Sequence, residues 1–229
     1  MLAFRTERGE YYLGDATTIL KEFPDEYFDI VVTDPPFFTK ERNHETGNYE
    51  DFVRALPEIY RILKKDSWFL IYFPSTRLPE LFRDVGKFFT YKDRFIVDFK
   101  STTTKGAFGD KKTLCLLVFS KGKPKINERF YTDILPGFED PLIVTLHPRS
   151  SLWKPTLVTS LILSKFIGRK KVKLLDPFAG YGSILIVAEK FGWEWVGIDV
   201  NEEIVEKARA ILLEGKEPRK VLGKKKKEK

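Results

Sequence analysis

The stretch LLDPFAGYGS, residues 174–183, decides the fold of this chain, because it leads from a buried strand through a glycine turn into a helix. Gly180 and Gly182 permit a tight turn and let a ligand approach the backbone closely. Short runs rich in Val, Ile and Leu alternate with helical stretches along the rest of the chain. This alternation is typical of a mainly parallel sheet with helices on both faces, so the predicted fold class is α/β.

The expected strands are short apolar runs that end in turn or polar residues: Tyr11–Leu13, Phe28–Thr33, Ser67–Phe73, Arg94–Phe99, Thr113–Phe119, Val172–Leu175 and Trp195–Ile198. Helical periodicity predicts the helices Tyr49–Leu63, Leu78–Phe88, Pro155–Phe166, Ser183–Phe191 and Glu202–Leu213. No repeat or linker indicates a second domain, so we expect a single domain over residues 1–215. Within it, residues 100–150 form a reduced substrate-contacting region, and residues 216–229 are expected to be a disordered basic tail.

Composition excludes several classes of protein. The chain of 229 residues is 42% hydrophobic and 14% aromatic, which allows a sizeable core and excludes extensive disorder. No apolar run reaches the ~18 residues that cross a bilayer, and the first residues lack a signal-peptide core, so we expect a soluble, cytoplasmic protein. A lone cysteine, Cys115, excludes a disulfide scaffold and a Cys-based zinc site, and we assign no metal.

The net charge of +7 is weak evidence for a nucleic-acid partner because of where it lies. Residues 216–229 hold eight basic and two acidic side chains, so the remaining chain is almost neutral. The sequence also has no Gln, four Asn and 32% charged residues, a bias expected of a hyperthermophile. Part of the lysine content is therefore explained by heat adaptation rather than by a ligand.

The glycine turn predicts a cofactor that carries no phosphate. Leu185 stands where the dinucleotide fingerprint requires a third glycine, which weakens any phosphate site. Asp199 follows a second strand nineteen residues after Gly180, a spacing at which a carboxylate takes both ribose hydroxyls. Asp176 ends the first strand and is placed to meet a cationic amino group. Adenosine plus an amino acid describes S-adenosylmethionine; the alternative is a simple helix-start turn, with Asp199 capping the last helix.

A second informative segment is TDPPF, residues 33–37, at the carboxyl end of an apolar strand. Two successive prolines remove two N–H donors, so the backbone there presents carbonyl acceptors only. Asp34 adds a carboxylate acceptor and Phe37 a flat apolar face, which together fit a planar ring bearing an exocyclic amino group. Acceptors for both amino hydrogens stabilise the positive charge that develops as the nitrogen attacks a sulfonium methyl. The alternative is a proline-terminated strand with a core phenylalanine.

Together, DPPF at 34–37 and LDPFAGYGS at 175–183 resemble the amino methyltransferases of nucleic acids. The order of the two motifs resembles the permuted, beta-type group of DNA N6-adenine and N4-cytosine methyltransferases. Gly14-Asp15 matches that group's G-D element near the cofactor adenine. His147-Pro148 with Lys154-Pro155 is similar to its H-P…K-P element, which borders the methionine end of the cofactor.

The resemblance implies a Rossmann-like class I methyltransferase fold with permuted motif order and S-adenosylmethionine as the cofactor. The implied catalytic residues are Asp34, Pro35, Pro36 and Phe37. The implied cofactor-binding residues lie in the G-D element, in the glycine turn and after the second strand: Asp15, Asp176, Phe178, Ala179, Gly180, Gly182, Ser183 and Asp199.

The chain departs from the family pattern in three places. Phe37 replaces the commoner tyrosine, which keeps stacking but loses a hydroxyl. Residues 149–153 lengthen the H-P…K-P element, so the roles of His147 and Lys154 stay open, and a core histidine is the simpler role for His147. Only residues 123–146 occupy the position of the usual recognition region, which is short for reading several base pairs.

The short recognition region favours structured RNA, and ribosomal RNA cytidine N4 is the specific expectation, because a structured RNA offers an unpaired base. The alternative is a DNA modification methyltransferase acting on adenine N6 or cytosine N4. A remoter alternative is a protein-methylating or cofactor-binding regulatory module. Whichever nucleic acid is bound, we expect four lysines of an aperiodic loop to contact its phosphates: Lys100, Lys105, Lys111 and Lys112.

Overall fold

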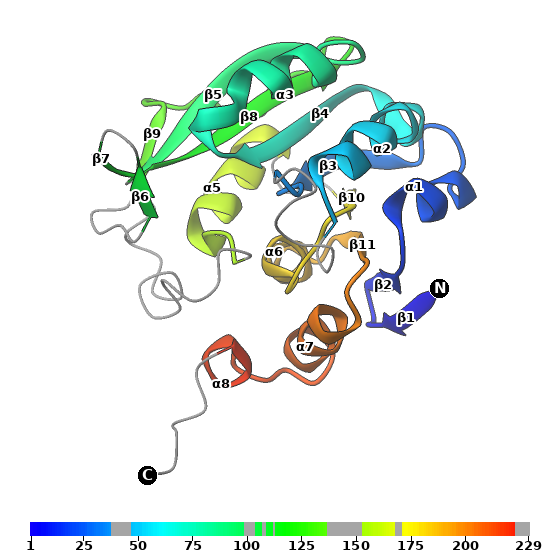
Figure 1. Cartoon of the computed structure of the whole chain (residues 1–229). Helices are drawn as coiled ribbons and strands as arrows, with labels where there is room; N and C mark the ends of the chain where they lie inside the picture. The colour runs from blue at the N-terminus through cyan, green and yellow to red at the C-terminus, as the bar shows by residue number, and fades with distance from the viewer. Residues whose placement is uncertain are drawn as a thin grey trace.

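The computed structural model describes residues 1–37, 47–98, 104–106, 109–111, 113–136, 153–167 and 171–222. Within these ranges, nine strands form one twisted sheet with helices on both of its faces (Figure 1). The strands of the sheet are β1 (Leu2–Arg5), β2 (Gly9–Leu13), β3 (Phe28–Thr33), β4 (Leu63–Phe73), β5 (Thr90–Asp98), β8 (Thr113–Lys121), β9 (Ile134–Pro136), β10 (Lys173–Asp176) and β11 (Glu194–Asp199). A separate hairpin consists of β6 (Thr104–Gly106) and β7 (Gly109–Lys111).

The helices are α1 (Ala16–Ile19), α2 (Tyr49–Ile62), α3 (Leu78–Val85), α5 (Thr156–Ile167), α6 (Ser183–Lys190), α7 (Glu202–Leu212) and α8 (Pro218–Leu222), with 3-10 turns η1 (Leu20–Glu22) and η2 (Ser75–Arg77). The sequence sets two of the helix starts. At α2, Asn48 and Asp51 form a reciprocal capping box, and at α7 the Asn201 side chain accepts from the Ile204 N–H. No helix among the described residues has the length and apolar character needed to cross a membrane.

The strand order is β1-β2-β11-β10-β3-β4-β8-β5-β9. Between β10 and β3 the direction in which the chain moves across the sheet reverses, and this point matters for function. From β10 the chain continues through α6 to β11 on one side, whereas from β3 it continues through α2 to β4 on the other. Strands β10 and β3 are parallel neighbours, with Leu175 opposite Val31. Ligands of open α/β sheets bind outside the carboxyl ends of such a pair. The carboxyl ends of these two strands carry Asp176 and, directly after β3, Asp34.

Apolar layers on both faces of the sheet hold this edge in place. One layer packs β3 and β10 against α5, α6 and α7, and includes Ile30, Leu185 and Val205. The other packs the opposite face against α1, α2 and α3, and includes Val31 and Phe52. Successive residues of β3 therefore face opposite layers, as the continuous apolar run of that strand predicts.

The structure matches the predicted strand over Phe28–Thr33 residue for residue and adds elements that the pattern did not predict. Strands β1 and β9 are short edge strands, and α1 spans one turn. Residues 218–222 of the expected disordered tail form the helix α8. Val221 and Leu222 pack against Trp153 and Ile211, which gives this short basic helix an apolar contact.

Candidate active site

The DPPF segment follows directly on the end of β3, at the carboxyl edge of the sheet. The Asp34 side chain is 13% exposed, and Pro35 is buried. The Phe37 ring meets Phe73 of β4 edge-on, with 6.3 Å between ring centroids. The Phe37 carbonyl accepts a hydrogen bond from the Arg77 guanidinium, so the end of the motif is anchored to η2.

The glycine turn after β10 has the backbone that only glycine adopts readily. Gly180 has φ +55° and Gly182 has φ +80°. A Cβ atom on Gly182 would lie 2.6 Å from Cδ1 of Leu212, so space as well as conformation requires glycine there. The Ala179 N–H donates to the Ile198 carbonyl at 2.8 Å, which ties the turn to the end of β11.

Asp199 faces this turn instead of capping the last helix. Its Oδ2 accepts from the Gly180 N–H at 3.0 Å, and its Oδ1 accepts from the Asn201 N–H at 2.9 Å. Asn201 is the N-cap of α7, so the capping alternative for Asp199 is wrong. Asp199 also lies beside the G-D element, because the Gly14 N–H donates a hydrogen bond to the Asp199 carbonyl at 2.9 Å.

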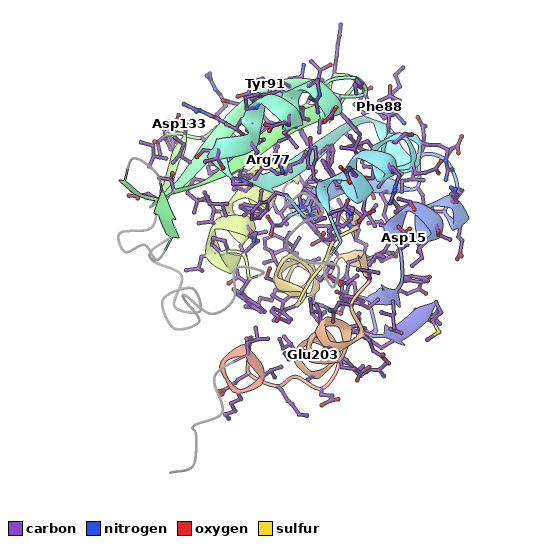
Figure 2. The ribbon with its side chains drawn as sticks, in the orientation of Figure 1. Asp15, Arg77, Phe88, Tyr91, Asp133 and Glu203 are labelled. Carbon is purple, nitrogen blue, oxygen red and sulfur yellow. The ribbon has the colours of Figure 1, made fainter. Side chains whose placement is uncertain are left out.

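Asp15 lies on the surface where β2 passes into α1 (Figure 2). Its side chain caps α1 by accepting from the Thr17 N–H at 2.8 Å. The element is therefore held close to the turn by backbone geometry, with its carboxylate at the rim rather than inside the site.

The two motifs are joined by a buried hydrogen bond between neighbouring strands. Thr33 Oγ1, at the end of β3, donates to Asp176 Oδ1 at 2.7 Å, and the Phe178 N–H donates to the same oxygen at 3.2 Å. Burial, with smaller contributions from Asp34 and Asp199, raises the pKa of Asp176 to about 7. Burial also raises the pKa values of Asp34 and Asp199. Three desolvated carboxylates in one place favour a cationic ligand.

Lys154, whose role the sequence left open, contacts both motifs. Its ammonium forms an ion pair with Asp34 Oδ2, and its backbone N–H donates to Ser183 Oγ at 3.0 Å. The Lys154 side chain is 6% exposed, so the pair is almost completely desolvated. The longer spacing of the H-P…K-P element therefore does not keep its lysine away from the site. His147 lies outside the described residues.

Sequence reasoning missed three residues that position the site. The buried Tyr11 hydroxyl donates to the Gly180 carbonyl at 2.6 Å, Thr33 bridges the strands, and Arg77 (Figure 2) holds the Phe37 carbonyl. The Arg77 guanidinium carbon also lies 5.1 Å from the centroid of the Tyr49 ring. Thr33 could have been found by its position directly before Asp34, but no local pattern marks the other two.

The remaining predicted cofactor residues lie in the turn as expected, and the substrate lysines are only partly described. Phe178 is half-buried and meets Phe52 edge-on, with 6.0 Å between ring centroids. Lys105 and Lys111 belong to the β6–β7 hairpin, which connects β5 to β8 on the sheet edge where β3 also ends (Figure 1). Lys100 and Lys112 lie outside the described residues.

Known proteins with similar sequences are methylases. No family model matches the chain. It is 25% identical over 199 residues to the putative methylase YubD of Escherichia coli (strain K12), covering 83% of this chain and 84% of YubD. It is 26% identical to the type II methyltransferase M.BamHI of Bacillus amyloliquefaciens, covering 96% of this chain but only 61%, less than two thirds, of that enzyme.

Solved structures with the same fold cover nearly the whole chain. The M1.HpyAVI–SAM complex matches with a TM-score of 0.70 and 19% identity, covering 89% of this chain and 98% of that one. The PvuII DNA methyltransferase, described as cytosine-N4-specific, matches with a TM-score of 0.70 and 18% identity, covering 96% of this chain and 92% of that one. These likenesses confirm the predicted Rossmann-like, mostly parallel fold.

Proposed function

We propose that this chain, which is a homologue of the beta-type amino methyltransferases, methylates the exocyclic amino group of a base in DNA. It is an S-adenosylmethionine-dependent methyltransferase that acts on the bases of nucleic acid. One observation carries the assignment of the site: Thr33 and Asp176 join the ends of β3 and β10 at 2.7 Å. That contact joins the strand before the DPPF segment to the strand before the glycine turn, which supports a single site for the base and the cofactor.

The residues of the turn fit the cofactor, whose contribution to the chemistry is a methyl group on a sulfonium. The buried carboxylate of Asp176 suits the ammonium of the methionine end. Asp199 accepts one backbone N–H on each oxygen, and a carboxylate retains further lone pairs for the ribose hydroxyls. In this proposal the exposed Asp15 lies near the adenine, and the backbone of residues 178–183 contacts the rest of the cofactor.

The base pocket uses Asp34 and the Pro35 carbonyl as acceptors for the two hydrogens of the target amine, with the ring against Phe37. Accepting both hydrogens makes the nitrogen more pyramidal and stabilises its developing positive charge. The nitrogen forms a bond to the methyl group as the sulfur–methyl bond of the sulfonium breaks to leave a neutral thioether, and the methylated nitrogen then releases one proton to solvent. Most of the rate enhancement comes from holding the two reactants in line.

DNA replaces RNA as the favoured substrate. The RNA expectation assumed that residues 123–146 are too few for a DNA enzyme, and the comparisons give it no support. A solved protein described as a DNA methyltransferase is matched over 92% of its own chain, so the length of this chain does not argue against DNA. Cytosine N4 and adenine N6 present the same kind of amino group, and the proposal includes both. Lys100, Lys105, Lys111 and Lys112 remain our predicted phosphate contacts.

The test is to incubate the protein with methyl-labelled cofactor and total DNA, RNA or protein from cells that lack the gene. Mass analysis of the labelled nucleoside is expected to give N4-methylcytosine or N6-methyladenine from the DNA. Label found only in RNA or only in protein would contradict the DNA assignment, and each outcome names the correct polymer directly.

Cofactor affinity is expected to depend on pH through Asp176, whose pKa is raised to about 7 by burial. Below pH 7 the neutral carboxyl loses its attraction for the cofactor's ammonium. The Kd is therefore expected to rise by up to about tenfold for each pH unit below 7. Calorimetry from pH 5.5 to 7.5 measures this, and Asp176→Asn, which cannot ionise, should bind weakly with a flat pH profile.

The ionisation of Asp176 also affects the stability of the cofactor-free protein. Its contribution falls as pH rises, whereas that of a salt-bridged aspartate falls as pH decreases. Because the folded pKa lies above the unfolded value of 3.8, the folded state keeps a proton that the unfolded chain loses. The contribution of Asp176 is thus fully present below about pH 4 and is lost as pH rises to about 7. For cofactor binding, an Asp176→Asn variant whose Kd follows the same pH profile as that of the parent protein would contradict the proposed role of Asp176 in binding the cofactor's ammonium.

A further inference from the structure

The ion pair between Lys154 and Asp34 has a chemical consequence for the base pocket. Asp34 is the carboxylate expected to accept an amino hydrogen, and its burial raises its pKa, so burial alone favours the neutral acid. A neutral carboxyl group is a weaker acceptor for a nitrogen that becomes positively charged. Lys154 lowers the pKa of the same carboxyl through its charge and its hydrogen bond.

The geometry points to Lys154 as a positioning residue that keeps Asp34 ionised and fixes its orientation for the target amine. This inference rests on the proposed function of the same site. The Lys154 ammonium binds Oδ2, and the other oxygen, Oδ1, is then the acceptor for the base. Lys154 acts through Asp34 and takes no part in the methyl transfer itself.

Hydrogen bonds of the backbone around Lys154 hold its side chain in position for the ion pair with Asp34. The Lys154 N–H donates to Ser183 Oγ, which lies at the start of α6, and Pro155 follows immediately before α5. The Thr159 hydroxyl donates to the Pro155 carbonyl at 2.7 Å and lies 2.7 Å from the Tyr72 hydroxyl of β4. Segment 153–155 is therefore attached to the cofactor turn on one side and to β4 on the other.

The charges around Asp34 show why a cation is needed there. Within the described part of the chain, Lys154 is the basic side chain that forms an ion pair with Asp34. The neighbouring carboxylate is Asp176 across the β3–β10 pair, whose own pKa is raised mainly by burial and, to a smaller extent, by Asp34 and Asp199. Without Lys154, the desolvation that raises the pKa of Asp34 would lose the charge and the hydrogen bond that oppose it.

The experiment compares the pH dependence of kcat for the parent protein, Lys154→Met, Lys154→Arg and a control, Lys165→Met. Methionine keeps most of the side-chain volume and removes the charge. The acid limb of the Lys154→Met profile is expected to move to higher pH by about one unit. At low pH, kcat therefore falls about tenfold relative to the parent protein, beyond any loss on the alkaline plateau. Lys154→Arg should restore most of the parent profile.

Lys165 is a matched control because it lies at the other end of α5, is 13% exposed and also pairs with a carboxylate, Glu128. Its replacement should leave the acid limb in place. Thermal unfolding and cofactor calorimetry on each variant separate loss of fold from loss of function. A parent-like acid limb in Lys154→Met overturns the inference, as does a rise in cofactor Kd without a shifted limb, which puts Lys154 in the cofactor pocket. Absence of methylation by the parent protein instead refutes the proposed function.

Discussion

Replacing Asp34 by Ala is expected to lower kcat by about three orders of magnitude, while cofactor binding stays measurable. In the proposed mechanism the carboxylate accepts a hydrogen of the target amine most strongly when that nitrogen carries positive charge, so its loss affects turnover more than binding. Single-turnover methylation of DNA and cofactor calorimetry on the same preparation separate the two quantities. Full activity in the Asp34→Ala variant would remove the catalytic assignment of residues 34–37.

Two companion variants make the Asp34 result specific. Asp34→Asn keeps one carbonyl acceptor and the size of the side chain, so it should retain more activity than Asp34→Ala. Asp93→Ala removes an exposed aspartate of β5, outside the region expected to contact the substrate, and should leave kcat unchanged. Because Asp34→Ala leaves the Lys154 charge buried without Asp34, its thermal unfolding must be recorded beside its activity.

Replacing Asp199 by Ala is expected to weaken cofactor binding by about 10- to 100-fold, the equivalent of ~1.5–3 kcal/mol for hydrogen bonds to a charged group. The variant loses the proposed acceptors for the ribose hydroxyls. It also releases the Gly180 N–H, which Asp199 Oδ2 holds at 3.0 Å, so the turn becomes less ordered before the cofactor binds. Calorimetry measures the change in Kd directly.

Asn201→Ala is the matched control for Asp199→Ala, because it also disturbs the start of α7. It removes the cap on the Ile204 N–H and should cost about 1 kcal/mol of stability. The backbone N–H of residue 201 still reaches Asp199, so the cofactor Kd should stay near the parent value. Equal losses of affinity in the two variants would assign the effect to α7 rather than to the ribose contact.

The core strands and main helices of the sheet could be predicted from sequence because they are local. The predicted strand Phe28–Thr33 and the start of α6 at Ser183 match the structure, since an apolar run and a glycine turn define them without help from distant residues. Strand β9 and helix α8 could not be predicted, because each becomes stable only on a partner surface. The expected heat-adapted origin stays a prediction from composition.

The sequence by itself predicted the groups to which we assign the proposed chemistry: acceptors without donors at residues 34–37, and a glycine turn with a carboxylate nineteen residues after Gly180. Only the tertiary structure decided which side chains contact the two motifs and hold them in position. Tyr11 meets Gly180 across 169 residues, and Thr33 meets Asp176 across 143. Lys154 meets Asp34 because β3 and the start of α5 converge on one edge of the sheet. Such contacts depend on strand order and register, which arise from packing the whole chain and leave no pattern in any short segment.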